Sequence, residues 1–137
     1  MARENGADRT INMASEPESL TSYEVNKGTF DVLYECTGAA PALAGGIATL
    51  RPGGVIVQLG LGGDMQVPVQ TITAKELQLR GSFRFHEEFF IGVELMRKGL
   101  IDVKPLITHT LGIDDAVAAF EIAGDRSQAM KAQIAFT

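Results

Sequence analysis

Residues 30–60 read FDVLYECTGAAPALAGGIATLRPGGVIVQLG, and this stretch decides the fold. Phe30 to Glu35 is rich in residues that favour strands. Pro41 opens a run of small residues that predicts a helix through Leu50. Val55 to Leu59 is an almost continuous apolar run, typical of a strand buried on both faces of a sheet. A strand, a helix and a second strand in this order indicate a right-handed βαβ unit with a parallel sheet.

Upstream of this unit the sequence predicts two short elements and a helix. Arg9 to Asn12 resembles a short strand. Ser15 is a candidate N-cap with Glu18 completing a capping box, which predicts a helix from about 15 to 27 that ends at Gly28. Gly6 has the character of a helix C-cap, but only five residues precede it, so we expect the chain to begin inside an element.

Downstream of the unit, strands and helices continue to alternate. We expect a turn at 51–54, a break at 60–63 and a loop that contains Pro68. The remaining predictions are a strand at 77–83, an amphipathic helix at 87–98, a strand at 106–111, a helix at 113–123 and a strand at 131–136. The sequence therefore predicts the α/β class.

Composition limits the possible partners. The 137 residues are 45% hydrophobic and 21% charged, which is typical of a globular protein. A net charge of -5 argues against nonspecific binding to nucleic acid or to an anionic membrane. No apolar run reaches the roughly 18–20 residues that span a bilayer, and no apolar signal segment follows Met1. We therefore expect no membrane partner and a cytoplasmic protein.

The residues that could bind metal are few. Cys36 is the single cysteine, so no intrachain disulfide forms, and we expect it to be a buried small hydrophobe. His86 is expected at a surface helix start, and His109 is expected to be structural within a strand. One cysteine and two widely separated histidines do not supply the ligand set of a zinc site, so we expect no metal site in this chain.

The order of motifs resembles the medium-chain dehydrogenase/reductases, in particular zinc-type alcohol and polyol dehydrogenases of the sorbitol and L-idonate kind. Three stretches carry the resemblance, which extends over essentially the whole chain. They are Gly6-Ala7-Asp8 with the short strand after it, residues 30–38 with 50–60, and residues 75–84 with 99–101 and 105–109.

The resemblance implies that the chain is the C-terminal portion of such an enzyme. Residues 1–85 would be the second half of a Rossmann domain, and residues 86–137 would return to the catalytic domain. The Gly-rich fingerprint for dinucleotides and the family's zinc ligands are absent from the sequence, so we expect no catalysis by this chain alone. The intact enzyme would use NAD or NADP and zinc to oxidise a polyol or secondary alcohol. Residues 66–81 would lie at a dimer edge, which implies a homo-oligomer.

The resemblance also implies cofactor contacts at the ends of strands, where doubly wound folds bind ligands. Thr37 and Gly38 would lie near the ribose or adenine, although a plain tight turn is the alternative. Residues 59–61, which are Leu59, Gly60 and Leu61, would lie against the nicotinamide ribose and carboxamide. Ser82, Phe83 and Arg84 would follow the last strand of the domain, where the backbone of Ser82 or Arg84 would contact the nicotinamide carboxamide. For Phe83, simple packing is the alternative. Lys131 would face the pyrophosphate, with a solvated surface lysine as the alternative.

Two other functions remain open at this point. Leu50 to Gly54 before an apolar strand also resembles the late part of S-adenosylmethionine-dependent methyltransferases, although their Gly-rich turn is missing. A short non-catalytic module that binds a nucleotide or a partner subunit is the second alternative.

Overall fold

The computed structural model describes residues 2–125 and 127–136. They divide into two compact units, which we call the sheet unit (residues 11–84) and the C-terminal unit (residues 2–10 and 85–136). The contact boundary falls between Arg84 and Phe85. The assignment of residues 1–85 and 86–137 to two family domains stays a prediction.

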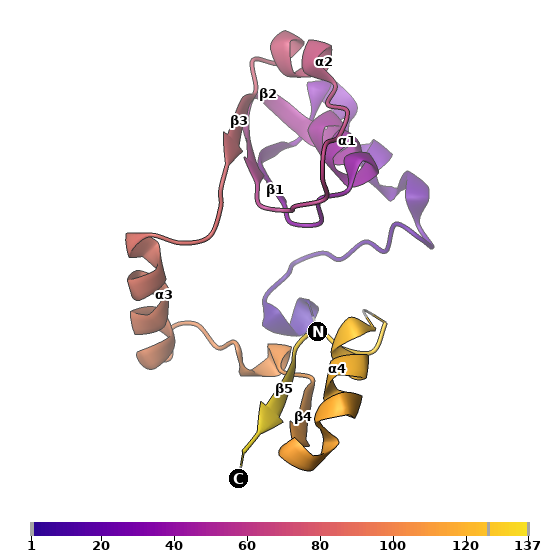
Figure 1. Cartoon of the computed structure of the whole chain (residues 1–137). Coiled ribbons are helices and arrows are strands. Elements are labelled where there is room, and N and C mark those ends of the chain that lie inside the picture. The colour runs from indigo at the N-terminus through magenta and orange to yellow at the C-terminus, as the bar shows by residue number, and fades with distance from the viewer. Residues whose placement is uncertain (1, 126, 137) are drawn as a thin grey trace. The chain divides into compact units, whose positions relative to one another are not determined.

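The sheet unit is built on three parallel strands in the order β1-β2-β3 (Figure 1). Its elements are β1 (Phe30–Glu35), α1 (Ala40–Thr49), β2 (Leu50–Gln58), α2 (Val69–Ala74) and β3 (Gln78–Gly81). A parallel sheet with helices between its strands confirms the predicted α/β class.

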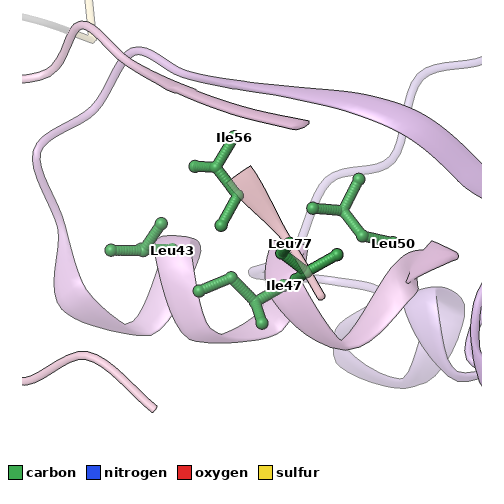
Figure 2. Close-up of a cluster of buried hydrophobic side chains, with 5 residues drawn as sticks. All are labelled: Leu43, Ile47, Leu50, Ile56 and Leu77. Atoms are coloured by element: carbon green, nitrogen blue, oxygen red, sulfur yellow. The ribbon is translucent and has the colours of Figure 1, made fainter. Parts of the chain in front are cut away.

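The core lies between α1 and one face of the sheet (Figure 2). It consists of Leu43, Ile47, Leu50, Ile56 and Leu77. Side chains alternate along a strand, so Val32 and Tyr34 point away from α1, and they are 42% and 67% exposed. Val55 and Val57 are only half-buried on β2. The expectation that residues 55–59 are buried on both faces is therefore wrong, because α1 covers one face only.

The predicted elements before β1 differ from the structure. Residues 9–12 form no strand, because no described segment pairs with them and an extended segment needs a hydrogen-bonded neighbour. The predicted helix is two 3₁₀ segments, Pro17–Tyr23 and Val25–Lys27. Ser15 does not cap either one, since its hydroxyl donates backward to the Asn12 carbonyl at 3.3 Å. Gly28 does end the second segment, as predicted.

The structure around β2 also differs from the prediction. The expected turn at 51–54 lies inside β2, where the register moves from the pair Phe30–Leu50 to the pair Val32–Val55. Two residues of β1 therefore match five residues of β2, so the Pro-Gly-Gly stretch interrupts the regular pairing of the two strands. The expected loop is present at residues 61–68, and Pro68 ends it at the N-cap position of α2, a helix that was not predicted.

The C-terminal unit contains α3 (Glu87–Arg97), β4 (His109–Gly112), α4 (Ala116–Gly124) and β5 (Ala132–Ala135). β4 and β5 pair in parallel, and α4 connects them. The strand predicted at 106–111 begins only at His109, because Lys104–Leu106 forms a 3₁₀ turn. Within residues 2–125 and 127–136, no helix is both long and apolar enough to cross a membrane.

Candidate functional site at the carboxyl edge of the sheet

The ends of β1 and β2 meet at one edge of the sheet. The Thr37–Gly38 turn follows β1, and the residues from Leu59 onward follow β2. The backbone amides of Leu59 and Gly60 both donate to the Glu35 carbonyl, at 2.8 and 2.9 Å. The two loops that leave these strands are therefore held side by side at the position where parallel sheets bind ligands.

Glycines allow the two loops to touch through their backbones. Gly38 has φ +71°, and a Cβ there would lie 2.6 Å from the amide nitrogen of Gly62. A Cβ on Gly60 would lie 2.0 Å from the amide nitrogen of Gly38. A Cβ on Gly62 would lie 1.8 Å from the Gly38 carbonyl oxygen. No other residue type fits these three positions without moving one loop away from the other.

The carboxylate of Glu35 is buried beneath this edge, with only 3% of the residue exposed. It accepts hydrogen bonds from the Thr37 amide at 2.8 Å, from the Thr37 hydroxyl and from the Gly38 amide at 2.9 Å. The amide nitrogen of Gln58 donates to its second oxygen at 2.6 Å. The Thr37 hydroxyl is the main cause that holds the pKa of Glu35 below its ordinary value, against the opposing effect of burial.

Gln58 connects this carboxylate to the end of β2 and to a cavity. Its side-chain nitrogen also donates to the Gly60 carbonyl at 2.9 Å, which fixes the orientation of the amide between two acceptors. Its Oε1 is buried and has no hydrogen-bond partner among the described residues. Gln58 lines a largely apolar cavity of about 470 Å³, together with Leu43, Leu61 and Leu79.

The third predicted segment leaves the neighbouring strand β3. The Ser82 amide donates to the Gln58 carbonyl at 2.9 Å, which ties this segment to β2. The Arg84 guanidinium lies 4.9 Å from the centre of the Phe83 ring, and both residues are exposed. Arg84 has φ +60°, an uncommon conformation for a residue other than glycine.

The structure therefore brings most of the predicted contacts to one edge. Gly38 lies against Gly60 and Leu61, and the amides of Leu59 and Gly60 are bound to the Glu35 carbonyl, two residues before Thr37. Ser82 joins this edge through β2. Lys131 lies in the other unit, directly before β5, and is exposed. Sequence reasoning missed Glu35 and Gln58. The alternation of β1 could have indicated Glu35, since it has the same parity as the core-facing Leu33.

The remaining candidates are peripheral. Cys36 is exposed, so the expectation of a buried thiol is wrong: it follows buried Glu35 and alternation turns it outward. His86 precedes α3 and is exposed, and the ring of His109 lies 3.0 Å from the Thr108 hydroxyl. In the part of the chain that the structure describes, no three His, Cys, Asp or Glu side chains gather into a metal-binding group. These residues do not fit zinc.

Comparison with known proteins identifies the class. A family model described as zinc-binding dehydrogenase matches residues 1–98. L-idonate 5-dehydrogenase of Escherichia coli K12 is 36% identical over 137 residues, which are 99% of this chain and 39% of that protein. D-xylulose reductase of Saccharomyces cerevisiae is 37% identical over 127 residues, which are 88% of this chain and 36% of that protein.

Solved structures agree with the sequence comparison. The crystal structure of the E. coli L-idonate 5-dehydrogenase matches at a TM-score of 0.90 and 36% identity, covering 98% of this chain and 38% of that one. An E. coli alcohol dehydrogenase crystallised with NADH matches at a TM-score of 0.81 and 27% identity, covering 98% of this chain and 40% of that one.

The chain belongs to the zinc-binding dehydrogenase family. It is similar to polyol dehydrogenases within that family, and it spans 36–39% of the length of the two relatives above. The predicted family is confirmed, and the methyltransferase alternative falls away.

Proposed function

We propose that this chain supplies one wall of the nicotinamide pocket in an NAD(P)-dependent, zinc-type polyol or alcohol dehydrogenase. The observation that carries the proposal is the contact between the Thr37–Gly38 turn and residues 60–62 at the carboxyl edge of a parallel sheet. This contact fixes the backbone of both loops at the edge where doubly wound sheets bind ligands. The bound nicotinamide would accept a hydride from the carbinol carbon of the substrate.

The chain's own residues would bind and orient the cofactor. Backbone groups of Leu61, Ser82 and Arg84 would hydrogen-bond the carboxamide and fix which face of the ring meets the substrate. Thr37 and Gly38 would contact the ribose side of the cofactor. The pyrophosphate contact of Lys131 stays a prediction from the family resemblance. Thr37 and Gly38 follow β1, Leu61 follows β2, and Ser82 and Arg84 follow β3.

Titration of the ¹⁵N-labelled chain with NADH and NADPH tests this assignment. We expect NADH to shift the amide signals of Thr37, Gly38, Leu61, Ser82 and Arg84. Gly38→Ala should weaken binding, because its Cβ would collide with the backbone of Gly62. Gly92→Ala is the matched control, since a Cβ there meets open space. Shifts confined to other residues, or none at millimolar NADH, would contradict the assignment.

A second consequence concerns turnover by the chain alone. The described residues offer no zinc-binding group, so we propose that the isolated chain does not oxidise alcohols. Incubation with NAD, zinc and either sorbitol or L-idonate should produce no NADH. Zinc-dependent formation of NADH by the pure chain would refute this proposal.

We also propose that the chain self-associates through the sheet face that α1 leaves open. Val32 and Tyr34 expose apolar surface there, next to half-buried Val57. Light scattering across a concentration series should show a mass above that of one chain. Tyr34→Lys should restore the monomer mass, and Gln70→Lys on exposed α2 should not. A clean monomer mass for the unmodified chain would overturn the proposal.

A further inference from the structure

We infer that Glu35 is a positioning residue whose ionised carboxylate locks the Thr37–Gly38 turn onto the end of β2. We call the set of hydrogen bonds to this carboxylate the lock. It would hold the backbone of the Thr37–Gly38 turn in the conformation that binds the cofactor. The inference therefore deepens the proposed function, and only its cofactor part rests on that proposal.

The hydrogen bonds around the carboxylate require the charged form. One oxygen accepts from the amide and hydroxyl of Thr37, and the other accepts from the Gly38 amide and from Gln58. The three N–H groups, from the Thr37 and Gly38 amides and from Gln58, can only donate, so a proton on the second oxygen would face two donors. The Thr37 hydroxyl accepts from the Ala39 amide at 3.0 Å and donates its own hydrogen to the carboxylate. A buried carboxylate is costly unless such bonds offset its lost hydration. None of these partners is charged, so neutral donors hold the ion.

The hydrogen bonds to Glu35 lie at the turn after β1, outside the cluster of core side chains. The core side chains Ile47 and Ile56 hold the body of the sheet. The loops beyond the strands have little apolar cover, and Leu61 is 78% exposed. The contacts found there are the backbone contacts between glycines and the hydrogen bonds to Glu35. Loss of the carboxylate should therefore loosen the edge and leave the pairing of Val32 with Val55 in place.

A charge exchange between Glu35 and Gln58 tests the lock. Glu35→Gln sets an amide NH₂ against other donors, and Gln58→Glu sets a second carboxylate beside the first. In the double variant, the new Gln can donate to the new Glu, although this Glu then faces the Gly60 carbonyl. Amide exchange at Thr37, Gly38 and Gly60 should rise about tenfold or more in each single variant, since a lost bond to a charged group has an effect of that order.

The internal reference for that measurement is Ile56, whose amide exchange should change less than about twofold because its strand pairing is intact. The double variant should protect the edge better than Gln58→Glu alone. Additive effects of the two substitutions, or equal acceleration at Ile56, would overturn the lock.

Binding of NADH tests the cofactor part separately. Glu35→Gln should weaken NADH binding about fivefold or more, while exposed Glu18→Gln, which removes the same charge, should leave it unchanged. Faster exchange at the edge with unchanged NADH affinity would disprove the positioning role. If the unmodified chain gives no NADH shifts, the proposed function fails, and the exchange data alone decide whether the lock exists.

Discussion

The two units of this chain bury their apolar side chains to very different extents. In the sheet unit Leu43, Ile47, Leu50 and Ile56 are at most 2% exposed. In the described part of the C-terminal unit only Ala119 is a buried hydrophobic, whereas Phe120 on the same helix is 74% exposed. A small core gives little stability, and exposed apolar surface marks contact with a partner. The sheet unit can therefore fold around its own core, and the C-terminal unit depends more on what covers it.

Truncation of a core side chain in the sheet unit should cause the largest loss in the free energy of unfolding. Ile47→Ala removes a fully buried side chain from the last turn of α1, and we expect it to lower the free energy of unfolding by about 2–5 kcal/mol. Phe120→Ala, at an exposed position, should change it by less than about 0.5 kcal/mol. Urea unfolding followed by NMR signals of each unit checks both. A larger cost for Phe120→Ala would show that the C-terminal unit has a core of its own.

The end of α1 provides a smaller and more specific test. Lys75 donates from its ammonium group to the carbonyls of Ala48 at 2.7 Å, Leu50 at 2.8 Å and Ile47 at 3.3 Å. These groups lie at the C-terminus of the helix, where a cation is favourable. Lys75→Met should destabilise the sheet unit by about 1–3 kcal/mol, because it leaves the carbonyls without this donor. Lys98→Met, at the exposed end of α3, should have no measurable effect in the same urea experiment.

Acidification should loosen the edge of the sheet unit before its core. The pKa of Glu35 is held below its ordinary value of 4.5, chiefly by the Thr37 hydroxyl. The carboxylate therefore contributes stability above that ordinary value, and the contribution is lost as the pH falls through the lowered pKa. Gly38 amide exchange, corrected for its intrinsic pH dependence, should accelerate relative to Ile56 only once the pH has fallen below the ordinary value of 4.5. Glu35→Gln should remove this difference, and an unchanged pH profile in that variant would contradict the assignment.

Local patterns predicted the parts of the fold that depend on local forces. The β-forming residues at 30–35 and the helical period of 87–98 identified β1 and α3. The strand expected at 9–12 was wrong because a strand exists only where a neighbour pairs with it. The turn expected at 51–54 was wrong because the same glycines also fit an irregular strand. Glu35 was missed because a charge near a strand end is usually solvated, and only its donors show that it is buried.

The smallest effect on the free energy of unfolding should come from the ion pair that joins β1 to the irregular stretch of β2. Arg51 lies 2.5 Å from Asp31, yet both side chains are more than half exposed, at 61% and 65%. Exposed pairs contribute about 0–1 kcal/mol, because solvent and salt screen them and two long side chains lose freedom. Asp31→Asn should therefore change the free energy of unfolding by less than about 0.5 kcal/mol, and added salt should reduce even that difference. A loss comparable to that of Lys75→Met would mean that the pair pins the irregular stretch of β2 against β1. The irregularity would then be held by charge, and not by the backbone conformation of its glycines.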